Sequence, residues 1–178
     1  EILLSETDLS HPAFGVGVGH TRDYGNLLSS NSTGWNGNSW LVSQAQKVVP
    51  AGDDRMAVVR GMNTSLWFAK VDEAWEPEMG VHASLVHDAA NKSYVLTNQG
   101  SGGQHVFNDL DASHGCALAG ALKQVIAPGG TSADLNYDAL GRLENYSVED
   151  AGSSVDYGYA YNDPGNGKLR MVTEKVNG

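Results

Sequence analysis

The 178-residue chain carries 11 basic and 21 acidic side chains, a formal net charge of −10 at pH 7. This charge excludes nucleic acid and any other partner bound mainly through its phosphates. Apolar residues make up 40% of the chain and charged residues 18%, so it can bury a core and is not wholly disordered. No apolar run approaches the roughly 18 residues of a membrane-spanning helix, and we expect no membrane span. The chain begins at Glu1 without an initiator methionine, which we interpret as a trimmed product or an excised piece.

Short apolar runs alternate with turn-forming residues at a spacing typical of antiparallel all-β proteins. In chain order, the predicted strands are Trp40–Gln44, Met56–Arg60, Ser65–Val71, Val81–His87, Ser93–Thr97, His105–Asn108, Ala133–Tyr137, Leu143–Val148, Val155–Tyr161 and Leu169–Glu174. Ala117–Gln124 fits a helix and a strand equally well. The five prolines fall between the predicted strands, where a missing N–H donor costs nothing. We therefore expect an all-β fold: an antiparallel β-hairpin meander whose repeat or solenoid-like sheet continues from an irregular N-terminal β segment.

One motif recurs in the C-terminal part of the chain. The first copy is Tyr137-Asp138-Ala139-Leu140-Gly141-Arg142-Leu143. The second copy is Tyr161-Asn162-Asp163-Pro164-Gly165-Asn166-Gly167-Lys168-Leu169. A fainter copy is His87-Asp88-Ala89-Ala90-Asn91-Lys92-Ser93-Tyr94. Each copy contains an aromatic residue, Asp or Asn, a few turn residues, Gly or Asn, a basic residue and the start of a new strand.

This pattern predicts a β-hairpin turn. Asp138 is placed to accept hydrogen bonds from backbone amides that follow it, which stabilises a type I turn. Gly141 supplies the residue with positive φ that closes the hairpin. We expect Gly165 or Gly167 to do the same in the second copy and Asn91 in the faint copy.

The return strands begin with the basic residues Arg142 and Lys168, whose alkyl stems are expected to cover aromatic surface. Beyond the first turn, Leu143 and Asn145 are predicted to share one face, with Tyr146 on the other. Before the second turn, tyrosines at alternate positions line one face of a strand: Tyr157, Tyr159 and Tyr161. We interpret these strands as hairpins that bury one face against the next hairpin.

The heptapeptide 137–143 closely resembles the YD-repeat of Rhs and teneurin-type proteins, and the lead-in 122–130 is similar to theirs. The resemblance covers residues 117–178. Upstream, residues 14–42 and 94–107 resemble the β-rich segment before the repeats of large bacterial surface YD-repeat proteins. The chain departs from the family in having too few copies to close a shell, and it contains neither a self-cleavage region nor a toxin domain.

The resemblance implies a β-hairpin spiral that forms part of a large hollow shell, exported or displayed at the bacterial cell surface. Family members use such shells to enclose toxins, to adhere or to bind carbohydrate. We expect a Gly/Ser/Asn-rich β segment over residues 1–116 and about two YD-type hairpins over residues 117–178. The expected function is structural or adhesive and non-catalytic, and the expected partners are other YD-repeat segments of the same parent protein or assembly.

Two alternatives stay open. A carbohydrate-binding module would use exposed tryptophans for stacking, with Trp35, Trp40, Trp67 or Trp75 as candidates, although the rings of Trp35 and Trp40 more often fill a core. A hydrolase would use Cys116, the only cysteine, with a histidine such as His114. Nucleophile and base normally come from separate elements, so we expect Cys116 to be an inert buried or loop side chain.

The sequence offers no established cofactor motif. The six histidines lack the HExxH spacing of a zinc site, and the glycine-rich residues 15–19 lack the Lys-Ser/Thr pair of a phosphate-binding loop. Acidic pairs such as Asp53-Asp54 offer oxygen ligands for calcium but do not form an EF-hand loop. We expect no cofactor, and calcium is the one metal left open.

Overall fold

The computed structural model describes residues 3–25, 33–61, 64–78, 80–111, 115, 117–162 and 167–177. Every regular element among them is a β-strand, which confirms the all-β fold class. The strands are β1 (Leu3–Ala13), β2 (Val16–Gly25), β3 (Thr33–Gly34), β4 (Gly37–Asn38), β5 (Trp40–Val42), β6 (Lys47–Pro50), β7 (Arg55–Val59), β8 (Ser65–Val71), β9 (Ala74–Pro77), β10 (Ala83–Asp88), β11 (Ser93–Asn98), β12 (Gln104–Asn108), β13 (Leu122–Ile126), β14 (Ser132–Tyr137), β15 (Leu143–Asp150), β16 (Ser153–Tyr161) and β17 (Leu169–Asn177).

Twelve of these strands form one continuous sheet in the order β17 to β6. Neighbours in this sheet are consecutive in sequence and antiparallel, which confirms the hairpin meander. β1, β2 and β5 form a second, three-stranded sheet, and β3 pairs with β4. The division at residues 116 and 117 stays a prediction, and the large sheet runs through it because β12 pairs with β13.

Every predicted strand overlaps an observed one, whereas β1, β2, β3, β4, β6 and β9 were not predicted. β13 overlaps the segment 117–124, which fits a helix and a strand equally well. The prediction that all prolines lie between strands is wrong. Pro12 lies within β1, Pro50 ends β6 and Pro77 ends β9. β1 and β6 are edge strands, and a strand edge or end tolerates a residue that lacks an N–H donor.

The core lies on one face of the large sheet, where alternate residues are buried as strand geometry requires. On β16, Val155, Tyr157 and Tyr159 are buried. On β15, Leu143 and Tyr146 are both buried, so the prediction that they face opposite sides is wrong. The pairing between β14 and β15 shifts register by one residue near Tyr137, and such a bulge changes which side chains point inward.

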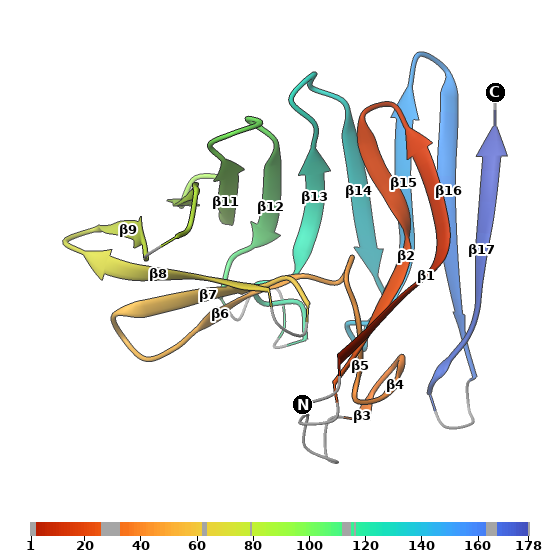
Figure 1. Ribbon diagram of the computed structural model, residues 1–178, viewed down its shortest axis with the longest axis horizontal. Coiled ribbons are helices and arrows are strands. Elements are labelled where there is room, and N and C mark those ends of the chain that lie inside the picture. The colour runs from red at the N-terminus through yellow and green to blue at the C-terminus, as the bar shows by residue number, and fades with distance from the viewer. Residues whose placement is uncertain are drawn as a thin grey trace.

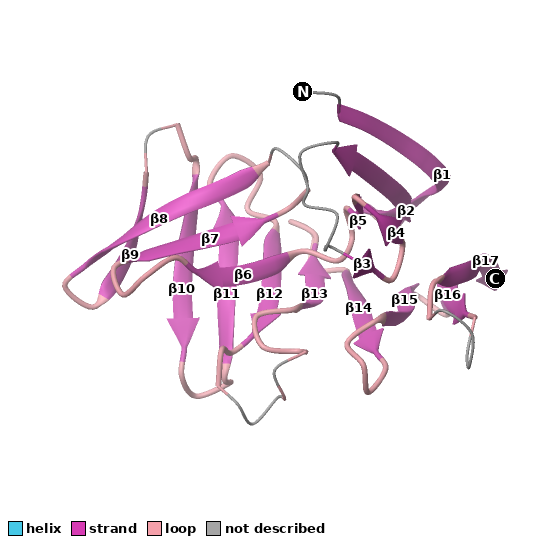
Figure 2. Ribbon diagram, turned by 90° about the horizontal axis from the view of Figure 1, so that it is seen from below, coloured by secondary structure: helices cyan, strands magenta, loops and turns pink. Residues whose placement is uncertain are grey.

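The β6 end of the sheet folds back onto the segment before β13. Figure 2 shows β6, β7 and β8 crossing over β10 to β13. The Val48 amide donates to the Gly120 carbonyl at 2.8 Å, and the Leu122 amide donates to the Gln46 carbonyl at 3.0 Å. Residues 117–120 therefore form a turn that is hydrogen-bonded to β6. In the segment 117–124, which fits a helix and a strand equally well, only the end is a strand.

The β1–β2 hairpin covers the buried face near β14 and β15 (Figure 1). Val16 and Val18 are buried in the same core cluster as Tyr146 and Tyr157. The Tyr146 hydroxyl donates to the Gly17 carbonyl at 3.3 Å, and burial raises the pKa of Tyr146 to about 12. The hairpin is thus attached to the large sheet by side-chain packing and not by strand pairing.

Gly120 provides a test of the fold-back contact. Its φ is +71°, and a Cβ at this position would lie 2.2 Å from the Val48 carbonyl oxygen. We expect Gly120→Ala to lower the free energy of unfolding by about 3 kcal/mol or more, because it combines a strained backbone with a backbone clash. Gly129→Ala is the matched control, since nothing lies within 4 Å of a Cβ there. Equal denaturant midpoints for the two variants would contradict the contact.

Candidate functional site

The first copy of the repeated motif forms a tight turn between β14 and β15. Asp138 Oδ1 accepts hydrogen bonds from the Leu140 and Arg142 amides, each at 2.9 Å. The Gly141 amide donates to the Asp138 carbonyl at 2.9 Å. Gly141 has a φ of +75°, the left-handed conformation expected from the sequence. Its missing side chain also leaves room for Ala117, because an added Cβ would lie 2.7 Å from the Ala117 Cβ.

Arg142 connects this turn to the second copy. Its Nε donates to Asp138 Oδ2 at 2.7 Å, and its Cζ lies 4.2 Å from the centre of the Tyr161 ring. Its Nη1 donates to the Gly167 carbonyl at 3.4 Å. Partial burial would raise the pKa of Asp138, but the hydrogen bonds from Arg142 and Leu140 and the positive charge of Arg142 together keep that pKa below its usual value.

The aromatic residue that opens each copy makes an equivalent bond. The Tyr137 hydroxyl donates to the carbonyl of Leu122 at 2.6 Å, and the Tyr161 hydroxyl donates to the carbonyl of Leu143. Each acceptor is the first residue of the strand that precedes and pairs with the tyrosine's own strand. Burial raises the pKa of both tyrosines. The first residue of the motif therefore forms a hydrogen bond that links the end of its own strand to the start of the preceding strand.

The second copy is described in part, and Gly165 lies outside the described residues. Gly167 has a φ of +65°, as predicted for one of the two glycines, and its amide donates to the Asn162 carbonyl at 3.2 Å. The Asn162 amide donates to the Lys168 carbonyl at 3.0 Å. Leu169 begins β17, and its amide donates to the Trp35 carbonyl at 2.6 Å.

The faint copy also closes with an aspartate. Asp88 accepts from the Asn91 amide at 3.1 Å and from the Asn91 side chain at 2.7 Å. The prediction that Asn91 takes the left-handed conformation is wrong, because Lys92 is the residue with positive φ, at 47°. Asn91 is instead bonded to Asp88 through its side chain, and the positive φ falls on the last residue before β11.

Trp35 and Trp40 lie together at one cavity of about 270 Å³, which Lys47 and Arg60 also line. The Trp35 ring meets the Tyr161 ring edge-on, with centroids 5.7 Å apart. The Trp40 ring packs against Tyr24 and lies 5.0 Å from the Arg22 guanidinium. Both rings are partly buried and contribute to packing, and the carbohydrate-binding alternative stays a prediction.

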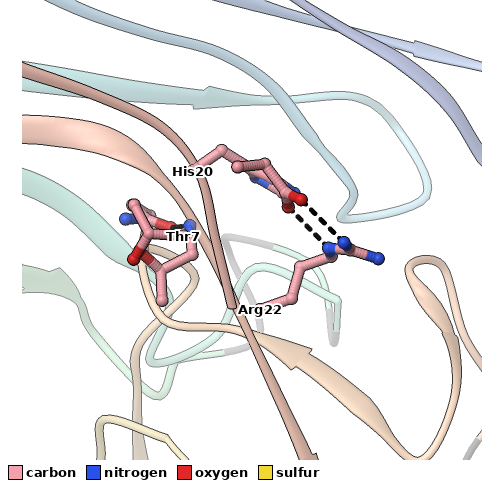
Figure 3. Close-up of polar contacts among 6 residues, drawn as sticks. Thr7, His20 and Arg22 are labelled. Carbon is pink, nitrogen blue, oxygen red and sulfur yellow. Dashed lines mark hydrogen bonds and ion pairs between the residues drawn. The ribbon is translucent and has the colours of Figure 1, made fainter. Parts of the chain in front are cut away.

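A polar cluster on the β1–β2 hairpin was missed by sequence reasoning (Figure 3). The pairing of β1 with β2 shifts register between Thr7 and Leu9, so Asp8 is the extra residue of a bulge. Arg22 donates from Nη2 to Asp8 Oδ1 at 2.7 Å and from Nε to Oδ2, which lowers the pKa of Asp8. The Asp8–Arg22 ion pair was not predicted because neither β1 nor β2 was predicted.

His20 lies beside this ion pair and is almost fully buried, at 2% exposure. Its Nε2 lies 3.7 Å from Asp8 Oδ2. Burial lowers the pKa of His20, although the nearby Asp8 carboxylate opposes this effect. His20 is therefore a neutral ring at neutral pH, with Asp8 on one side.

The remaining predictions concern a nucleophilic cysteine and bound calcium. Cys116 and His114 lie outside the described residues, and the hydrolase alternative stays a prediction. Among the described residues, no group of three or more His, Cys, Asp or Glu side chains is arranged to bind a metal ion. Calcium binding stays a prediction. In the same part of the chain there is no helix with the length and apolarity needed to cross a membrane.

Comparison with known proteins adds no relative. No protein-family model matches the sequence, and no curated protein matches it.

The equivalence of the two tyrosines gives a testable prediction. Tyr137→Phe and Tyr161→Phe should each lower the free energy of unfolding by about 1–2 kcal/mol, because each leaves a carbonyl without its hydrogen bond. Chemical denaturation measures this loss. Tyr24→Phe is the control, since the Tyr24 hydroxyl has no hydrogen-bond partner among the described residues. A neutral result for either motif tyrosine contradicts the equivalence.

Proposed function

We propose that this chain is a non-catalytic structural segment of a YD-repeat protein, in which it contributes β-hairpins to an extended shell or fibre. The observation that supports this most directly is the position of Arg142. It closes its own turn through Asp138 and contacts Tyr161 and Gly167 of the next copy. A motif whose contacts reach the following copy is suited to a repeated array, in which neighbouring units stabilise each other.

The two ends of the large sheet support the same function. At one end, β6 bonds back to the turn before β13. At the other end, β17 pairs only with β16 among the described strands. Met171 and Val176 on β17 are 51% and 55% exposed. A long edge strand with exposed apolar residues is a template for pairing with another strand. The repeat array would therefore continue from β17.

The resemblance to YD-repeat proteins also supports a proposal for the location and the partners of this chain. The motif residues 137–143 suggest export to, or display on, a bacterial cell surface, with other YD-repeat segments as partners. The net charge of −10 is compatible with this setting because such a charge favours solubility. Adhesion through the assembled array belongs to the same proposal.

Self-association through β17 tests this function. Sedimentation equilibrium should give a mass that rises above 18.8 kDa with increasing concentration, because the open edge pairs with that of a second molecule. The double variant Met171→Lys/Val176→Lys should remain monomeric, since charges on an edge strand oppose pairing.

Val86→Lys is the matched control, because Val86 is 58% exposed on β10 in the interior of the sheet. It should associate as the wild type does. A wild-type chain that stays monomeric at every concentration, or equal association by the edge variant, contradicts the proposal.

A further inference from the structure

The cavity beside the two tryptophans lies on the face of β6 and β7 that points away from the core. Lys47 and Val49 occupy alternate positions on β6, so they share one face of that strand, and Val59 of β7 is paired with Lys47. All three line the cavity. The next residues point the other way, because Val48 and Val58 are fully buried in the core cluster. The cavity is therefore separate from the hydrophobic core.

Most of the lining is apolar. Its apolar side chains come from the segment 35–45 and from the outer face of β6 and β7: Trp35, Trp40, Leu41, Val42, Ala45, Val49 and Val59. An apolar cavity of about 150 Å³ binds benzene. The space of about 270 Å³ therefore has room for one ring with a short chain attached. Binding sites for small molecules are typically apolar in this way, with a few polar groups that fix the orientation of the ligand.

Apart from Asn36, the polar side chains of the lining are donors. Lysine, arginine and the indole N–H donate hydrogen bonds and accept none. Among the described residues, the indole Nε1–H groups of Trp35 and Trp40 have no hydrogen-bond partner. Both keep accessible surface, since the buried side-chain atoms without a partner are His20 Nδ1, Asn36 Nδ2 and Tyr159 Oη. A ligand that uses these indole groups has to accept hydrogen bonds.

The cavity is also positively charged, in a chain whose net charge is −10. Lys47 and Arg60 line it, and neither has an ion-pair partner in the part of the chain that the structure describes. The described lining contains no Asp or Glu side chain. Asp23 lies next to Gly61, and its Oδ2 accepts a hydrogen bond from Ser43 at 2.6 Å. Two unpaired cations favour an anion, and charge-assisted hydrogen bonds to a carboxylate are among the strong ones.

These groups suit a carboxylate better than a neutral sugar. Sugar hydroxyls donate hydrogen bonds as well as accept them, and the described lining offers no carboxylate that would accept from them. We propose that this cavity binds a small aromatic carboxylate, with its ring against the tryptophans and valines and its carboxylate on Lys47, beside Arg60.

This site goes beyond the proposed structural function. No residue of β16 or β17 is part of the described lining, so the cavity is distinct from the edge strand that is expected to pair. The edge variant Met171→Lys/Val176→Lys should therefore bind the ligand as the wild type does. Loss of ligand binding would likewise leave the association through β17 intact, so that the two proposals fail separately.

Calorimetric titration of the full chain with 3-phenylpropionate tests the site. 3-Phenylpropanol, which has the same ring and a hydroxyl in place of the carboxylate, should bind at least about tenfold more weakly, because it carries no charge. Propionate, which has the carboxylate without the ring, should show no measurable binding. D-glucose should show none either, because the lining lacks acceptors for its hydroxyl groups.

Two variants locate the ligand in the cavity. Lys47→Gln should weaken phenylpropionate at least about tenfold and leave phenylpropanol unchanged, because it removes the positive charge alone. Val59→Phe should abolish the binding of both, because its ring fills the space. Lys70→Gln is the matched control, since it removes a lysine of β8 that is not part of the lining, and it should bind as the wild type does.

Circular dichroism and the denaturation midpoint verify that each variant is folded. The proposal is overturned if the wild type does not bind phenylpropionate up to about 10 mM. It is also overturned if folded Lys47→Gln or folded Val59→Phe binds it as the wild type does. D-glucose that binds as tightly as phenylpropionate would assign the cavity to carbohydrate and contradict the proposal.

Discussion

The contact between Arg142 and the second copy of the motif is the interaction on which the C-terminal half depends. A turn closed by an aspartate and a glycine needs only local residues. Arg142 adds a bond to Asp138 and a contact with the Tyr161 ring, so the same side chain closes the first turn and packs against the second copy. Arg142 therefore contributes both to the turn and to the packing between hairpins, which explains why a basic residue follows the glycine.

The buried face of the sheet sets the second constraint. A twelve-stranded meander has two faces, and burying one of them requires other elements. The β1–β2 hairpin and the fold-back of β6 meet this need, and residues far apart in sequence, such as Val16 and Tyr157, share one core. Covering a curved sheet with a separate hairpin also creates a seam. The unpaired atoms of His20, Asn36 and Tyr159 lie near this seam, where packing does not supply every hydrogen bond.

Sequence reasoning predicted what is decided locally. Most strands from residue 40 onward, all but β6, β9 and β13, follow from alternation and turn chemistry, as do the turn role of Asp138 and the positive φ at Gly141, because these features involve residues close in the chain. The β1–β2 hairpin was missed because its Gly-rich sequence resembles a loop, and its strands are stabilised by packing on a distant sheet. The Asp8–Arg22 pair depends on that hairpin, and the cavity beside Trp35 and Trp40 depends on β6, which was also missed, so neither could be found from spacing alone.

The central claim is that the motif's stabilising contacts run between copies, and a double-mutant cycle on Arg142 and Tyr161 tests it most directly. Arg142→Ala, Tyr161→Leu and the double variant are compared by chemical denaturation, which separates the pairwise energy from the effect on Asp138. The account predicts a coupling energy of about 1 kcal/mol, as expected for a partly buried cation–π contact. Additive losses, with coupling below about 0.3 kcal/mol, would contradict it.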